Sequence, residues 1–107
     1  MSGTTVQDEL TTTAATIFTA SGVVAQVIAA DVTEKAGAGQ TGTVHVVKSG
    51  GAIADADTFT FAFAVTSGGV AQLTTLLSHL LLPGDTIQML ASANTAVNTK
   101  ISVVYLP

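Results

Sequence analysis

The stretch TFTFAFAV, residues 58–65, alternates large apolar residues with threonine and alanine at a period of two. In an extended chain, successive side chains point to opposite faces. The aromatic residues therefore share one face: Phe59, Phe61 and Phe63. This pattern predicts a β-strand laid over a core. The opposite face carries no charge, and three of its residues are candidates for contact with a partner: Thr58, Thr60 and Ala62.

Segments with strand character lie on both sides of this stretch and are separated by glycine-containing turns. Residues 17–18, 23–32 and 43–51 precede it, and residues 86–90 and 100–107 follow it. Short strands divided by turns predict an all-β fold, an antiparallel β-sandwich or jelly roll. We expect the three phenylalanines to be buried together, with neighbours from the last two strands: Ile87, Met89, Ile101 and Val103.

The leucine-rich segment at residues 70–82 fits both a helix and a strand. Its leucines have helical spacing, but the segment is short, and Thr74 and Thr75 do not favour a helix. The sequence Pro83-Gly84-Asp85 follows it. Proline fixes φ, glycine permits a positive φ, and aspartate can accept hydrogen bonds from nearby backbone N–H groups. These three residues predict a tight corner that leads into the next strand.

The N-terminal residues 1–15 are polar and threonine-rich, and Val6 and Leu10 are their large apolar residues. We interpret them as an arm that precedes a β-sandwich domain at residues 16–107. Polar termini are usually disordered unless something holds them. The arm is therefore expected to be mobile in the free protein. It is either a disordered tail or an arm that becomes ordered on a neighbour, with Val6 and Leu10 as its interaction residues.

The charge content is low. Only 9% of the 107 residues are charged, against about 25% in average soluble proteins. Because a free monomer usually keeps a charged surface, this composition favours a chain whose surface is covered by other subunits. The net charge of −4 comes with three lysines and no arginine, which argues against a nucleic-acid partner. No apolar run approaches the roughly 20 residues of a membrane helix, so no membrane partner is expected.

Each motif that could indicate a chemical activity matches its pattern only in part. GAGQTG, residues 37–42, matches a dinucleotide fingerprint, but the residues after it predict a strand where the fingerprint requires a helix. Asp55 and Asp57 lack the rest of a calcium loop. His45 and His79 have no cysteines to complete a zinc site. No serine lies in a nucleophile elbow. We therefore expect no catalytic residues, no metal site and no cofactor, and a protein that is not an enzyme.

Two stretches carry a family resemblance: LTTTAATIFTAS at residues 10–21 and LLLPGDTIQMLASANTAVNTKISVVYLP at residues 80–107. Their order resembles that of small virion structural proteins of tailed bacteriophages. The resemblance implies a β-sandwich that acts as a capsid decoration (cement) protein, clamping adjacent subunits of the major capsid protein, as a homotrimer on the outer surface of a virion assembled in the host cytoplasm. The alternatives are a tail- or fibre-associated component and a sugar-binding surface module.

Overall fold

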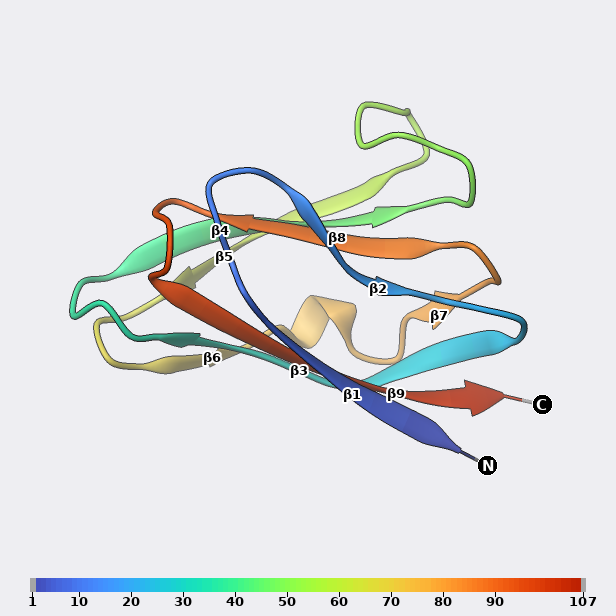
Figure 1. The fold of residues 1–107 in the computed structure, drawn as a ribbon, viewed down its shortest axis with the longest axis horizontal. Helices are drawn as coiled ribbons and strands as arrows, with labels where there is room; N and C mark the ends of the chain where they lie inside the picture. The colour runs from blue at the N-terminus through green and yellow to red at the C-terminus, as the bar shows by residue number, and fades with distance from the viewer. Residues whose placement is uncertain (1, 107) are drawn as a thin grey trace.

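The computed structural model describes residues 2–106, which form two antiparallel sheets packed face to face (Figure 1). The fold is thus an all-β sandwich, as the sequence predicts. In this part of the chain the elements are β1 (Gly3–Glu9), β2 (Ala15–Thr19), β3 (Val24–Glu34), β4 (Gln40–Val47), β5 (Phe59–Val65), β6 (Val70–Gln72), a 3-10 turn (Thr74–Leu76), β7 (Leu80–Leu81), β8 (Thr86–Ala91) and β9 (Val97–Leu106).

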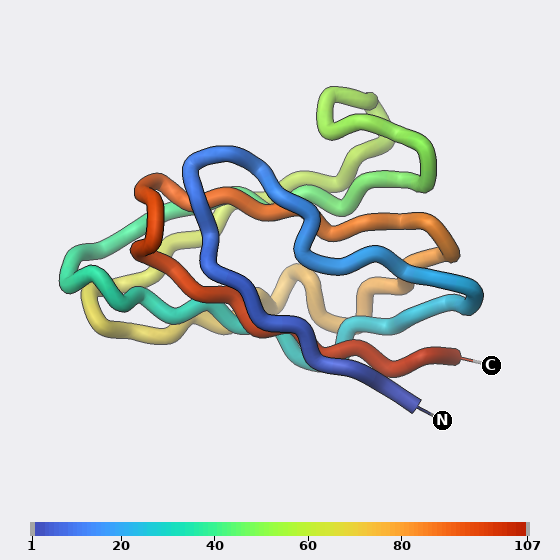
Figure 2. Tube along the Cα trace, viewed as in Figure 1, coloured from blue at the N-terminus to red at the C-terminus, as the bar shows by residue number. Residues whose placement is uncertain are grey.

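The first sheet has the strand order β1-β9-β3-β6, and β7 pairs with another part of β3. The second sheet has the order β2-β8-β4-β5. The chain passes from one sheet to the other after β1, β2, β3, β5, β7 and β8, and the tube trace shows its path (Figure 2). Strands far apart in sequence therefore lie side by side, and the sandwich has extents of 41 × 30 × 19 Å.

The core lies between the inner faces of the two sheets. The largest fully buried side chains are aliphatic and come from both sheets: Leu10, Leu76, Leu81, Ile87, Met89, Ile101 and several valines. The three phenylalanines of β5 share one face, as predicted, but they are not equally buried. Phe63 is 8% exposed, Phe61 is half-buried and Phe59 is 41% exposed. The expectation that all three are buried together is wrong for Phe59, which begins β5, an edge strand with a neighbouring strand on one side only.

Phe63 owes its burial to a glycine on the neighbouring strand. Gly42 is the register partner of Phe63 across the β4–β5 pair. A side-chain carbon at position 42 would collide with the Phe63 ring and with the carbonyl oxygen of Leu90. The ring therefore lies across the bare backbone of β4. This close approach explains the glycine inside a strand, a position that glycine otherwise weakens.

The sequence of residues 70–82 fitted both a helix and a strand, but the segment does not form one continuous element of either kind. It forms β6, one 3-10 turn and β7, and both short strands pair with β3. Leu73, Leu76 and Leu81 are buried, whereas Leu80 is half exposed. The leucines that resembled one helical face are therefore divided between the core and the outer surface. Extended pairing is favoured because the free edge of β3 has N–H and C=O groups that a helix would leave without partners.

Asp85 organises the predicted corner. Gly84 has a φ of +93°, in the region that favours glycine. The Asp85 carboxylate is buried and accepts hydrogen bonds from the backbone N–H of Leu82 and from that of Ser49, both at 3.0 Å. The Asp85 carbonyl accepts a third bond from the N–H of Ala20 at 2.9 Å. One residue thus joins the end of β2, the end of β4 and the start of β8.

Residues 3–9, which were expected to be mobile in the free protein, form β1 at the edge of the first sheet. All seven residues of β1 have register partners on β9, from Gly3 opposite Val104 to Glu9 opposite Asn98. Leu10 is 1% exposed, and its N–H donates to the Val97 carbonyl at 2.8 Å. The edge of β9 supplies the backbone partners that a polar segment needs for order, so a neighbouring subunit is not required.

The carboxylate of Asp85 gives the first test. Asp85→Ala is expected to lower the free energy of unfolding by about 2–3 kcal/mol, because two buried N–H groups lose their charged acceptor. Asp57→Ala, at an exposed position, should change it by no more than about 0.5 kcal/mol. Urea denaturation of the two variants measures the difference. Equal effects of the two substitutions would contradict the role given to Asp85.

The unequal burial along β5 gives a second test. Phe63→Ala is expected to cost about 3–5 kcal/mol through lost burial and a cavity. Phe59→Ala should cost only roughly 1 kcal/mol, since much of its ring already contacts solvent. Phe61→Ala should lie between them. Denaturant unfolding of the three variants tests this order, and a Phe59 variant as unstable as the Phe63 variant would refute it.

Candidate functional site

The outer face of the second sheet carries no charged residues on its three strands β5, β4 and β8. Val44, Phe61 and Met89 are register partners and point into the core. Side chains one residue along each strand therefore point outward. We call this outward set the neutral face: Thr43, His45, Thr60, Ala62, Ala64, Gln88 and Leu90. It offers uncharged groups across three adjacent strands, which suits contact with another protein surface.

The structure divides the three residues predicted on this face. Thr60 and Ala62 are exposed on the neutral face, and the Thr60 hydroxyl lies 2.9 Å from Nδ1 of His45. Thr58 precedes β5 and is half-buried, and its hydroxyl donates to the Ala52 carbonyl at 2.9 Å. Thr58 therefore closes the loop before β5. A role for these residues in contact with a partner stays a prediction.

The two residues predicted from the N-terminal segment lie apart from the neutral face. Val6 is opposite Ile101 and packs partly against the core. Leu10 belongs to the core itself. While β1 stays paired with β9, the Leu10 side chain is covered by its own chain. Contact of Val6 and Leu10 with another subunit also stays a prediction.

A groove of about 180 Å³ runs along the free edge of β5. It is lined on one side by Phe61–Ala64 and on the other by residues 71–75 of β6 and the 3-10 turn. Sequence reasoning did not identify this feature, because edge positions depend on which strands pair.

At the start of the same strand, the Phe59 ring stacks on His79 with ring centroids 5.4 Å apart. Burial, assisted by the charge of Lys48, lowers the pKa of His79 from its ordinary value.

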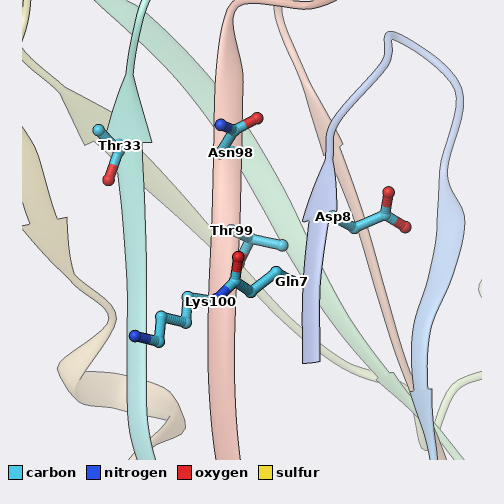
Figure 3. A pocket seen from close by; sticks show the side chains of 6 residues that line it. All are labelled: Gln7, Asp8, Thr33, Asn98, Thr99 and Lys100. Atoms are coloured by element: carbon cyan, nitrogen blue, oxygen red, sulfur yellow. The ribbon is translucent and has the colours of Figure 1, made fainter. Parts of the chain in front are cut away.

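A larger surface pocket, about 380 Å³, lies over the first sheet (Figure 3). It is lined by residues from three strands: Gln7, Asp8, Thr33, Asn98, Thr99 and Lys100. The Lys100 side chain extends toward β3, whereas Asp8 points away from it (Figure 3). The charged groups do not converge on a point where a substrate atom could react, so this geometry suggests no catalytic arrangement.

The fingerprint-like GAGQTG stretch is a loop followed by a strand, since β4 begins at Gln40. Its first N–H group, that of Gly37, is used within the chain. The buried carboxylate of Glu34 accepts hydrogen bonds from Ala36 at 2.6 Å, from Gly37 at 3.0 Å and from Gly68 at 2.7 Å. These backbone bonds, with Gly68 first, lower the pKa of Glu34 from 4.5, and burial opposes them. A glutamate of the same chain therefore occupies the place that a phosphate would need.

Three of the remaining motif residues, Asp55, His45 and His79, have partners within the chain. Asp55 accepts a hydrogen bond from the Ala52 N–H at 2.8 Å and shapes the loop before β5. His45 and His79 contact Thr60 and Phe59 as described. Among residues 2–106, no three acidic, histidine or cysteine residues gather into a possible metal site. In the same range, no helix has the length and apolar character to cross a membrane.

The fold has a counterpart among solved structures. One match is a structure described as "Bacillus endospore appendages form a novel family of disulfide-linked pili". The similarity has a TM-score of 0.55 at 19% sequence identity and covers 97% of this chain and 84% of the other. At this identity the match establishes a shared fold. No protein-family model matches the chain, and a search of curated proteins found no significant match.

Glu34 predicts how stability depends on pH. Its pKa is lowered in the folded state, so its stabilising contribution is fully present above 4.5 and is lost as the pH falls below that value toward the folded pKa. The melting temperature should therefore fall as the pH is lowered through this range. In Glu34→Gln the three N–H groups lose their charged acceptor, and at least one of them loses its acceptor altogether, so the melting temperature should be lower at pH 7 and fall less in acid. Asp57→Asn, at an exposed position, should retain the wild-type profile; an unchanged profile in Glu34→Gln would contradict the assignment.

Proposed function

We propose that this chain is a non-enzymatic structural subunit, of which many copies take part in one assembly. The specific proposal is a capsid decoration protein of a bacteriophage, which bridges adjacent major capsid subunits. The observation that carries the proposal is the neutral face. A sheet surface without charged residues suits burial against protein, because no charge has to lose its water on contact. The sequence resemblance to small virion structural proteins of tailed bacteriophages is the reason for proposing a phage capsid as the assembly.

The role would be mechanical. A two-layer sandwich of paired strands presents a rigid surface, so little conformational entropy is lost when that surface binds. Threonine, glutamine and histidine groups on the neutral face can donate and accept hydrogen bonds, while Ala62, Ala64 and Leu90 add apolar area. Each contact is modest. Repeated over a capsid lattice, such contacts would hold neighbouring capsid subunits together, and the net charge of −4 suits a surface that faces away from DNA.

A second candidate is a tail, fibre or appendage subunit. It is favoured by the fold shared with the structure described as that of disulfide-linked pili. The 107 residues contain no cysteine, so contacts between copies of them would be non-covalent. A sugar-binding module is less well supported. Tyr105 is half-buried, and Phe59, the exposed aromatic residue of the described chain, is stacked on His79.

Quantitative mass spectrometry of purified virions tests this proposal. A decoration protein should be present in many copies, in fixed proportion to the major capsid protein. A tail component should be present in few copies, and a chain absent from virions would overturn the phage role. Thr43→Asp, which adds a charge in the middle of the neutral face, should reduce particle occupancy, whereas Ser102→Asp on the first sheet's outer face should not.

A further inference from the structure

The sandwich described over residues 2–106 has two edge strands in each sheet. The first sheet ends at β1 on one side and at β6 with β7 on the other. The second sheet ends at β2 and β5. A free edge presents unpaired N–H and C=O groups that can pair with another chain, so soluble proteins usually block their edges with charges, bulges or short strands.

Three of these edges have such protection. On β1, Asp8 is the partner of the inward-pointing Thr99, so a charge sits on the core side of an edge strand, and Glu9 follows it. The pairing of β2 with β8 contains an irregularity between Thr16 and Phe18. Strands β6 and β7 have three and two residues. Each device limits the pairing of a further strand at that edge.

The edge at β5 has none of these devices. The strand has seven residues, FTFAFAV, with no charge and no proline, and its register with β4 is regular from end to end. Aromatic and β-branched residues give it a high strand propensity. A segment of this kind at an exposed edge is expected to add a strand from a partner.

We propose that β5 pairs with β5 of a second copy of this chain in antiparallel orientation, which joins two four-stranded sheets into one of eight strands. A strand paired with itself about a two-fold axis must be free of charges that would face their own copies. β5 meets this condition. The inference concerns contact between copies and does not depend on the virion role.

The most complete register is centred on Ala62, because this alone pairs all seven residues. Ala62 then faces Ala62 of the second copy, Phe61 faces Phe63, and the exposed Phe59 faces Val65. Asp57, just before the strand, lies far from Asp57 of the second copy because the strands run in opposite directions. A parallel arrangement would place these two carboxylates side by side, where they would repel each other.

The groove beside β5 fits this arrangement. In a continued sheet the inward side chains of the second copy lie on the same side as those of the first, next to the wall formed by residues 71–75. That wall contains polar and small residues that can approach a neighbouring copy. The half-buried Phe61 and the exposed Phe59 would gain cover there.

A homotrimer, which the sequence led us to expect, would use a different contact. A three-fold ring joins two different surfaces at each interface, whereas a two-fold contact joins one surface to itself. If the ring were closed by strand pairing, β5 would have to meet one of the protected edges. The unprotected edge is thus complementary to itself and favours a dimer.

Charge substitution at the centre of the contact tests the inference. Light scattering after size exclusion, with the purified chain, should give twice the 10.7 kDa chain mass at high concentration. Ala62→Lys and Ala62→Glu should each weaken the dimer at least about ten-fold, because each places like charges face to face. A mixture of the two variants should restore dimers that contain one copy of each, detected by native mass spectrometry. Thr5→Lys, at the middle of the β1 edge, is the matched control and should dimerise like the wild type.

A wild-type chain that stays monomeric, or an Ala62→Lys variant that dimerises normally, would overturn the inference. A trimer weakened by Thr5→Lys would also overturn it and indicate a contact through β1. If the variants at position 62 fail to fold, hydrogen exchange of the wild-type chain gives the same answer: amides of β5 should become protected as concentration rises. The presence or absence of the chain in virions leaves these outcomes unchanged.

Discussion

The carboxylate of Asp85 is the contact on which the arrangement of the second sheet depends. Strands β2, β4 and β8 all begin or end near this side chain. By accepting bonds from Ser49 and Leu82 while its carbonyl accepts one from Ala20, Asp85 fixes the three connections relative to one another. A buried carboxylate is stable in this place because backbone N–H groups surround it.

Glu34, the last residue of β3, has a corresponding role where that strand ends. Figure 1 shows the course of β3 through the first sheet. It binds the turn that follows β3 and also Gly68 in the turn between β5 and β6. Two of the chain's seven acidic residues are therefore buried in turns and contribute little to the surface charge. The surface is consequently even less charged than the composition indicates. This internal use of acidic groups leaves the neutral face and the β5 edge free of them.

The sequence predicts most of the strands because their patterns are local. The alternation in residues 58–65 and the corner at Pro83-Gly84-Asp85 both depend on neighbours in the chain, and both are confirmed. Features set by pairing could not be predicted in this way. The exposure of Phe59 and the docking of residues 3–9 depend on which strand lies next to them. The candidate site shows the same division: the uncharged alternation indicated Thr60 and Ala62, whereas the free edge of β5 has no local signature.

The position of β9 in the middle of the first sheet has a consequence for how the chain is synthesised. Its partners β1 and β3 are synthesised long before it. Gly3 pairs with Val104, which lies 101 residues further along the chain (104 − 3). Closing so long a loop is entropically costly, and contacts of high sequence separation slow folding. On the ribosome, β4 and β5 can pair early, whereas β1 and β3 remain without the strand between them until β9, Val97–Leu106, has been made. Until then the nascent chain carries strand edges that are open to pairing with other chains.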